Sequence, residues 1–411
     1  MGEVVELNLP EHGHMNATYP LVAELVRRGE KIVYYATDPF RPNVIAAGAE
    51  FARYGDTEIF TPGAHTGGLH SVMAWEMTLA EHLLPRLIDE VADANPDYLL
   101  IDSMCVWGNL VQQILHIPAV CMASVFVPND RAVTVEQMVQ LAYGQAPKPV
   151  LLAGIDALNT YIETSRRIDR RFGTLSPNIV EFFSNRQELN LLFTAREFHP
   201  EGDSFGADYR FVGPMLEFER HESTANATLP PGDEPLIYIS MGTIFNDLPD
   251  FYRTCIQAYA GAPFRVLISI GSRVRRATLD PVPHNIQLCD YVPQLAVLMQ
   301  ASLFISHGGM NSVSEALAHG VPLLVFPQHG DQHLVAAQVE RVGAGIRLAP
   351  ADITVARLRE LTETLLCEPR FKAGACAVAR VFSRGGGAAV AADAIFEFAQ
   401  NSTSQKVSSE V

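Results

Sequence analysis

The chain has 411 residues, of which 48% are hydrophobic and 18% are charged, and its formal net charge is −16. This length predicts two or three domains, and the composition excludes a disordered protein. The negative charge excludes a broad cationic surface for nucleic acid or anionic membranes. A polyanionic ligand would therefore have to be bound locally, by backbone N–H groups and helix ends.

The N-terminal stretch and the cysteines indicate a cytoplasmic protein. The first residues carry neither a basic region nor a long apolar run, so no signal peptide is expected. No stretch of about 18 consecutive apolar residues occurs, so no membrane insertion is expected. The six cysteines form no CxxC pair, which leaves zinc and redox motifs unsupported.

The first part of the chain alternates short apolar strands with helices. Val4–Leu9 is predicted to be a strand, and a helix is expected from Asn16, a good N-cap residue, to Gly29. Lys31–Ala36 follows as a second strand, and this β–α–β order predicts a parallel sheet. Further strands and helices of this kind are expected at Tyr98–Ile101, Gly108–Leu115, Ala119–Ser124 and Leu191–Thr194.

Three stretches interrupt the alternation. Residues 55–90 and 126–185 are expected to be longer and more irregular than the rest. Phe218–Pro235 is polar and rich in Pro, Gly, Ser and Thr, which is typical of an interdomain linker. The sequence therefore predicts a first domain over residues 1–217 and a linker over 218–235.

The alternation of strands and helices resumes after the linker. Strands are expected at Leu236–Ser240, Arg265–Ile270, Ile286–Cys289, Leu303–Ser306 and Leu323–Phe326, and helices at Ser312–His319, Asp331–Arg341 and Ala388–Ala399. We predict a second domain over residues 236–400, whose last helix could pack back onto the first domain, and a frayed tail over 401–411. Both domains are expected to be doubly wound α/β folds, with ligands at the carboxyl ends of their strands and in a cleft between the domains.

A turn rich in glycine gives the strongest chemical signal. Ile305–Gly320 reads ISHGGMNSVSEALAHG: an apolar strand, a tight turn, and a helix that begins near Asn311. Small residues let backbone N–H groups approach an anion, and a helix N-terminus favours negative charge. His307 and Ser312 could donate hydrogen bonds to phosphate, and Glu315 could accept hydrogen bonds from ribose hydroxyls. The pattern predicts a diphosphate site without a Walker lysine.

Other loops of the second half add groups suited to a sugar nucleotide. Ile239–Thr243, ISMGT, is another small polar turn after a strand. Tyr291–Leu295, YVPQL, offers an aromatic face and backbone groups for a nucleobase. Asp331 and Gln332 follow a further strand, and a neighbouring carboxylate and amide suit the vicinal hydroxyls of a hexose.

The N-terminal half offers a base for a hydroxyl nucleophile. His14 lies in the loop between the first strand and its helix, and imidazole is suited to proton transfer near neutral pH. Asp102 ends a strand of the same sheet and could orient the imidazole. His12 is an alternative base, two residues earlier.

In this order and spacing, the motifs HGHMN, ISMGT, YVPQ, SHGGMNSxxE and DQ resemble the signature of family 1 UDP-glycosyltransferases, above all the bacterial macrolide-glycosyltransferase branch. The resemblance covers nearly the whole chain. It implies a GT-B fold: two facing Rossmann-like domains, the first for the acceptor and the second for the donor. Tyr291 stands where most relatives have Trp, Met310 where plant relatives have Trp, and Ala17 where relatives usually have Pro.

The resemblance assigns roles residue by residue. It assigns the nucleoside to Tyr291, Val292, Gln294 and Glu315. It assigns the phosphates to Ser240, Gly242, Thr243, His307, Gly309, Asn311 and Ser312. It assigns the sugar hydroxyls to Asp331 and Gln332, and catalysis to His14 and Asp102.

The implied reaction is a single in-line displacement with inversion, in which the base takes the acceptor proton and the helix N-terminus stabilises the departing diphosphate. No metal or cofactor is expected, because the sequence lacks a DxD triplet. The expected partners are a UDP-sugar, with glucose favoured by Asp331 and Gln332, and a small apolar acceptor such as a macrolide, a flavonoid or other phenol, or a terpenoid. A dTDP-deoxysugar transferase, a GT-B-shaped epimerase or hydrolase, and a non-catalytic helper remain alternatives.

Overall fold

The computed structural model describes residues 2–55, 59–60, 68–128, 148–216, 229–243, 246–328 and 330–409. The chain forms two compact units. The first consists of Met1–Arg220 and Gly385–Val411, and the second of His221–Arg384. Each unit is built on a parallel sheet with the strand order of a doubly wound fold, so the prediction of two Rossmann-like domains is confirmed.

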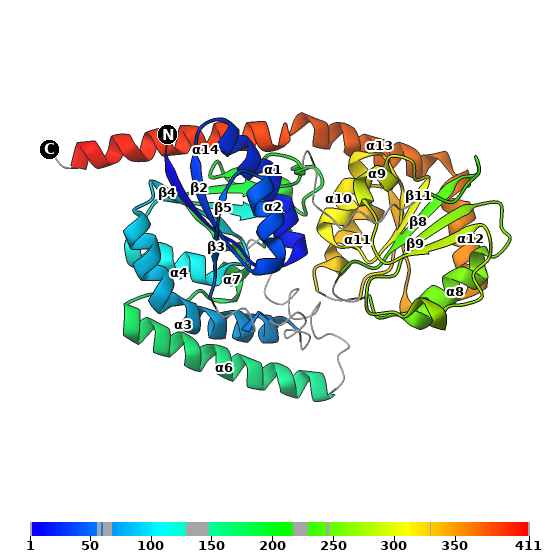
Figure 1. The fold of residues 1–411 in the computed structure, drawn as a ribbon, viewed down its shortest axis with the longest axis horizontal. Helices are drawn as coiled ribbons and strands as arrows, with labels where there is room; N and C mark the ends of the chain where they lie inside the picture. Colours follow the sequence, from blue (N-terminus) through cyan, green and yellow to red (C-terminus); the bar gives the residue numbers. More distant parts are fainter. Residues whose placement is uncertain are drawn as a thin grey trace. The chain divides into compact units, whose positions relative to one another are not determined.

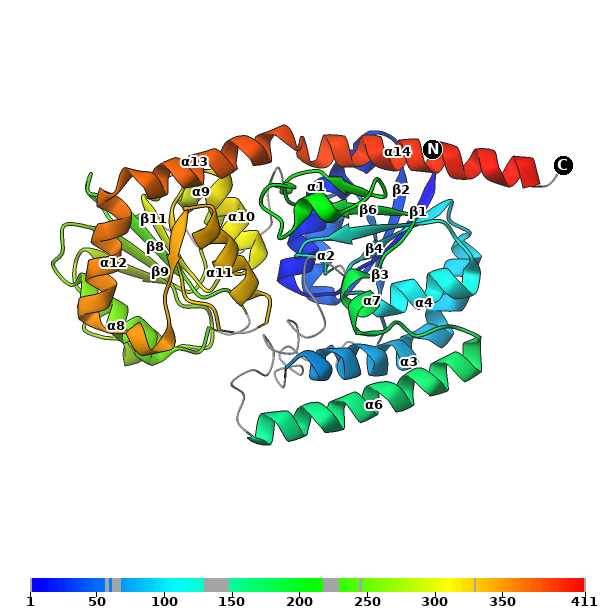
Figure 2. The ribbon, with the colours of Figure 1, turned by 180° about the vertical axis from the view of Figure 1, so that it is seen from behind.

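The first unit contains a seven-stranded parallel sheet in the order β3-β2-β1-β4-β5-β6-β7. Figures 1 and 2 show α3 and α6 side by side, and α14 running along α1. The elements are β1 Glu3–Leu7, α1 His12–Arg27, β2 Lys31–Ala36, α2 Arg41–Ala46, β3 Glu50–Arg53, α3 Leu69–Ala94, β4 Tyr98–Asp102, α4 Val106–Leu115, β5 Ala119–Ala123, α6 Lys148–Phe172, α7 Ile179–Ser184, β6 Leu189–Leu192, β7 Tyr209–Phe211 and α14 Gly387–Ser409.

The second unit contains a six-stranded parallel sheet in the order β10-β9-β8-β11-β12-β13. Its core on one face joins the strands to apolar residues of α8 and α12. The elements are β8 Leu236–Ser240, α8 Pro249–Tyr259, β9 Arg265–Ser269, β10 Ile286–Cys289, α9 Gln294–Leu298, β11 Leu303–Ser306, α10 Met310–Ala318, β12 Leu323–Val325, α11 Gln332–Arg341, β13 Gly345–Arg347, α12 Val355–Cys367 and α13 Pro369–Arg384.

Each sheet reverses its strand order once, and this reversal positions the candidate site. β1 lies between β2 and β4 in the first unit, and β8 lies between β9 and β11 in the second. In the first unit, the helices that follow β1 and β4 therefore leave the sheet in different directions. The same holds for the helices that follow β8 and β11 in the second unit. The gap between them at the carboxyl ends of the strands is where open α/β sheets bind ligands.

Several expected elements differ from the structure. α1 begins at His12, with Glu11 as its N-cap residue, so Asn16 lies inside the helix and the expected cap there is wrong. Long helices, α3 and α6, occupy much of the two stretches expected to be irregular. α3 contains Pro85, and Met77, Leu84 and Val91 bury one face of this helix.

The C-terminal part of the chain agrees with expectation in one respect and differs in two. Gly385–Val411 group with the first unit, which is the packing considered for the last helix. The second unit ends at Arg384 and not at residue 400, and α14 extends to Ser409, through most of the tail expected to fray. Most of the expected linker, residues 218–228, lies outside the described residues. Of the helices that the structure describes, none combines the length and the apolar run needed to cross a bilayer.

The position of α14 gives a prediction about stability. Ile395 is fully buried in the core that α14 shares with α1, whereas Val390 on the same helix is 42% exposed. Ile395→Ala should lower the free energy of unfolding by about 2–5 kcal/mol, because it leaves a cavity. Val390→Ala should change it by less than about 0.5 kcal/mol. Urea denaturation measures both, and equal effects would contradict the assigned packing of α14.

Candidate functional site

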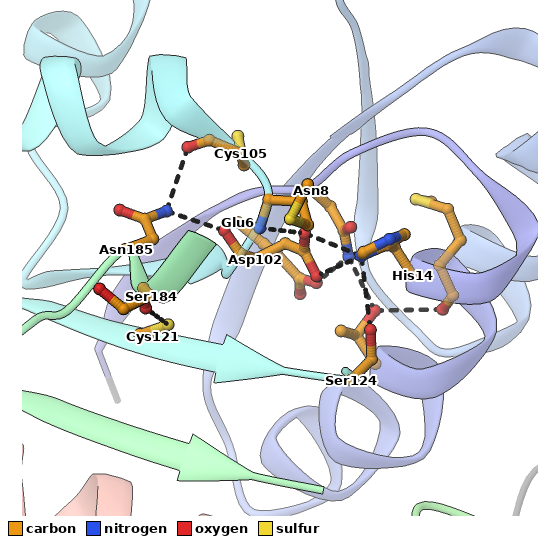
Figure 3. A network of polar contacts seen from close by, with 12 residues as sticks. Glu6, Asn8, His14, Asp102, Cys105, Cys121, Ser124, Ser184 and Asn185 are labelled. Atoms are coloured by element: carbon orange, nitrogen blue, oxygen red, sulfur yellow. Dashed lines mark hydrogen bonds and ion pairs between the residues drawn. The ribbon is translucent and has the colours of Figure 1, made fainter. Parts of the chain in front are cut away.

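The first unit brings the two predicted catalytic residues into contact at the switch point of its sheet. His14 lies in the first turn of α1, not in the loop before it, and Asp102 is the last residue of β4. Nδ1 of His14 lies 3.0 Å from the Asp102 carboxylate. The imidazole side chain is 12% exposed and the carboxylate is fully buried. Figure 3 shows the pair within a larger polar network.

The surroundings of Asp102 fix the protonation of the imidazole. A carboxylate oxygen of Asp102 accepts a hydrogen bond from the backbone N–H of Met104 at 2.9 Å, and its backbone carbonyl accepts from the Asn185 amide at 2.9 Å. A carboxylate only accepts hydrogen bonds, so the proton is assigned to Nδ1 of His14. Nε2 of the neutral ring is then an acceptor. This is the tautomer that a general base requires.

A buried polar cluster lies behind this pair, between β1, β2 and α1. The Asn8 amide nitrogen lies 3.3 Å from Oε1 of Glu6, 3.1 Å from Oγ1 of Thr18 and 2.7 Å from the Tyr34 hydroxyl. Thr18 in turn donates to the backbone carbonyl of Met15 at 3.1 Å. Because Met15 directly follows His14 in the chain, the cluster connects the first turn of α1 to the sheet.

Two further carboxyl groups are buried near Asp102. Burial, opposed by hydrogen bonds and reinforced by the charge of Asp102, raises the pKa of Glu6 to about 8. Burial and the charges of Asp102 and Glu11 raise the pKa of Glu76 well above its usual value. Burial therefore favours the neutral form of both groups, and Asp102 is the member of this trio with an imidazole partner.

In the second unit, the predicted phosphate turn is a tight assembly around His307. Gly242 and Gly309 press against this ring: a Cβ on Gly242 would lie 2.6 Å from Cε1, and one on Gly309 would lie 2.5 Å from Nε2. Gly242 also has φ +76°, which favours glycine. Both glycines are thus needed for the imidazole to sit where it does.

The turn presents backbone groups and a neutral imidazole. Gly309 is the N-cap residue of α10 and has no side chain to cap the helix, so backbone N–H groups point out of its N-terminus. Burial lowers the pKa of His307 to about 4, although a backbone hydrogen bond with Ser240 opposes the shift. At neutral pH the ring therefore donates an N–H without a full positive charge. Such a turn suits an anion.

Loops after three neighbouring strands meet at this turn. The backbone N–H of Gly242, after β8, lies 3.4 Å from Oγ of Ser240, and Thr243 follows it. A Cβ on Gly308, after β11, would lie 3.2 Å from the backbone oxygen of Gln332, after β12. The expected convergence of these segments at one sheet edge is therefore present.

The predicted nucleoside residues occupy α9, α10 and the loop before them. Gln294 donates from its amide nitrogen to Glu315 at 2.6 Å and to Ser312 at 3.1 Å. Tyr291 is 40% exposed, as a stacking surface must be, and Val292 beside it is buried. The roles of these residues remain predictions.

The remaining predicted residues lie at the starts of α10 and α11. Asn311 is in the first turn of α10, and Asp331 is the N-cap residue of α11. Gln332 is buried, and its side-chain oxygen accepts the backbone N–H of Gln328 at 3.0 Å. Gln332 thus orders its own loop, a contact that the sequence did not predict.

Sequence reasoning missed several residues that contact the predicted ones, among them Ser124, Asn185 and Tyr238. The Ser124 hydroxyl lies 3.4 Å from Nδ1 of His14, and Asn185 holds the Asp102 carbonyl. Tyr238 donates to the Gln294 side-chain oxygen at 3.1 Å. Ser124 ends an expected strand and could have been found by its place at the sheet edge. Asn185 and Tyr238 lie in no motif and carried no signal.

Comparison with known proteins shows similarity along almost the whole chain. Residues 260–393 match the family described as Erythromycin biosynthesis protein CIII-like, C-terminal domain. The NDP-glycosyltransferase YjiC of Bacillus licheniformis is 32% identical, over 95% of this chain and 96% of its own length. The oleandomycin glycosyltransferase of Streptomyces antibioticus is 28% identical, over 95% of this chain and 90% of its own length.

A solved structure agrees with the fold. The glycotransferase of kitacinnamycin has a TM-score of 0.82 to this chain and is 26% identical, with 96% of this chain and 98% of that chain covered. The fold of this chain is therefore GT-B, with a Rossmann-like sheet in each unit.

The buried carboxyl of Glu6 predicts a pH-dependent stability. Its pKa is about 8 in the folded chain and near 4.5 when exposed, so the folded state holds the proton more tightly between these values. Stability should therefore fall as the pH rises from 4.5 to 8. Glu6→Gln removes this titration. The free energy of unfolding of this variant relative to wild type should therefore increase by more than about 1 kcal/mol from pH 5 to pH 8. Urea denaturation at both pH values measures this, and a constant difference would contradict the assignment.

Proposed function

The chain belongs to family 1 of the glycosyltransferases, in its bacterial macrolide-type branch, and we propose that it transfers a hexose, glucose first, from UDP to a hydroxyl of a small apolar acceptor with inversion. One observation carries this proposal. The imidazole of His14 is held by the buried carboxylate of Asp102 at 3.0 Å in the tautomer that leaves Nε2 as an acceptor. Such a pair suits deprotonation of a hydroxyl whose own pKa is far above neutrality.

The proposed reaction is a single displacement. The acceptor oxygen attacks the anomeric carbon as its proton passes to Nε2 of His14. The bond from the anomeric carbon to the UDP oxygen breaks, and the electron pair leaves with UDP. Asp102 stabilises the imidazolium that forms, and because it already accepts the Nδ1 proton, the ring need not reorient. Attack opposite the leaving group turns an α-linked donor into a β-glycoside.

The departing charge is proposed to be stabilised by the second unit. The N-terminus of α10 and the N–H of His307 supply electrostatic stabilisation at the diphosphate without a metal ion. Asp331 and Gln332 are proposed to bind hexose hydroxyls, and Tyr291 to stack on uracil. Glucose is proposed because a carboxylate beside an amide can bind two adjacent hydroxyls, and glucose offers such pairs along its ring.

A direct assay tests the function. The full chain is incubated with UDP-glucose and a panel of a macrolide, a flavonoid and a simple phenol, and the products are examined by mass spectrometry. A gain of one hexose on an acceptor supports the proposal. Release of UDP and glucose without an acceptor product would instead indicate a hydrolase, and no turnover with any acceptor in a chain that binds UDP would favour a non-catalytic helper.

The two N-terminal histidines separate the base from its neighbour. His14→Ala should reduce transfer by at least about 100-fold, because it removes a general base, and should leave the affinity for UDP within about twofold. His12→Ala is the matched control: this exposed ring packs on Phe40 at 5.0 Å, and its loss should leave most of the rate. Transfer rates and UDP calorimetry measure both variants. If His12 were the base, His12→Ala would lose transfer and His14→Ala would keep most of the rate.

A further inference from the structure

A hydrogen-bonded relay links the second sheet to the predicted ribose residues. Tyr238 on β8 donates from its hydroxyl to Oε1 of Gln294, the first residue of α9, at 3.1 Å. Nε2 of Gln294 lies 2.6 Å from Oε2 of Glu315 and 3.1 Å from Oγ of Ser312, both on α10. Four side chains from three elements thus form one connected chain.

Hydrogen-bond chemistry allows one orientation of the amide. The Glu315 carboxylate only accepts hydrogen bonds, so the Gln294 nitrogen must face it. The Gln294 oxygen must then face Tyr238, which makes the phenol the donor. If the amide turned over, its oxygen would meet the carboxylate of Glu315, and two acceptors at 2.6 Å repel.

The tyrosine that holds the Gln294 oxygen in this orientation is itself fixed. Tyr238 is buried, and its ring stacks on Phe304 of the neighbouring strand β11, with centroids 4.8 Å apart and an interplanar angle of 9°. The two residues are direct register partners in the parallel ladder. The sheet therefore holds the phenol hydroxyl in place before any nucleotide arrives.

The orientation decides which groups the relay offers to a ligand. Both N–H bonds of the Gln294 amide point at Ser312 and Glu315. This part of the site therefore offers a ligand hydrogen-bond acceptors: a carboxylate oxygen of Glu315 and the second lone pair of the Gln294 amide oxygen. The vicinal 2′- and 3′-hydroxyls of ribose are donors and can form hydrogen bonds with these acceptors. A 2′-deoxyribose has one donor fewer and leaves a polar group of the protein without its hydrogen bond.

Resting on the proposed function, we propose that Tyr238 is a positioning residue that makes the donor site select ribonucleotides over 2′-deoxyribonucleotides. The natural donor is then a UDP-sugar rather than a dTDP-sugar. The tyrosine acts through Gln294 and Glu315 and does not touch the reacting atoms.

Calorimetry with UDP and 2′-deoxy-UDP tests the proposal, because the two ligands share base and phosphates and differ by one hydroxyl. The wild-type chain should bind UDP at least about tenfold more tightly than 2′-deoxy-UDP. Tyr238→Phe should lower this ratio below about threefold, mainly by weakening UDP, since the Gln294 side chain loses its donor and no longer holds Glu315 in a fixed place.

Tyr259→Phe is the matched control. This buried phenol of the same unit bonds to Thr362 at 2.7 Å, on the α12 side of the molecule, and its loss should leave the ratio within about twofold of wild type. A ratio unchanged by Tyr238→Phe, or lowered equally by Tyr259→Phe, overturns the proposal. So does a wild-type ratio near one, which is measurable even if a variant fails to fold. Absence of any UDP binding or of hexose transfer by the wild type would instead overturn the proposed function.

Discussion

The reversal of strand order in each parallel sheet is the constraint on which the candidate site depends. Where neighbouring strands send their chains to opposite sides, the carboxyl edge stays open, and the residues that follow those strands meet there. β1 and β4 bring His14 to Asp102 in this way. β8 and β11 bring Gly242 to His307 in the other unit. The same topology, used twice, builds the proposed proton-transfer pair and the proposed anion-binding turn.

Burial then separates the roles of three acidic groups in the first unit. Glu6, Glu76 and Asp102 are all fully buried, and burial raises the pKa of Glu6 and of Glu76. Asp102 alone of the three ends a strand, where it receives the N–H of Met104 and the imidazole of His14. Its carboxylate is therefore the group of the three that is placed to stabilise a positive imidazolium.

The sequence predicted the parts of the site that lie in local motifs or at the ends of expected strands. The turn around His307 and the position of His14 after the first strand follow from local patterns of glycine, caps and apolar runs. The partners Ser124, Asn185 and Tyr238 did not follow, because each acts through a contact between segments far apart in the chain. The helices α3 and α6 were missed for a related reason: α3 packs against α6, α4 and the core of the sheet, and such tertiary contacts stabilise a helix without a local signal.

The anion-binding turn uses dipoles where a lysine could have stood, and this matters for turnover. UDP as product carries more negative charge than the UDP-sugar that enters, because the bond to the sugar is replaced by a phosphate oxygen. A fixed cation would therefore bind the product more tightly than the substrate and slow its release. The neutral ring of His307 and the backbone N–H groups of α10 respond less steeply to that extra charge. In the proposed reaction the same groups stabilise the charge that develops as the bond breaks, so the site can favour the transition state without trapping the product.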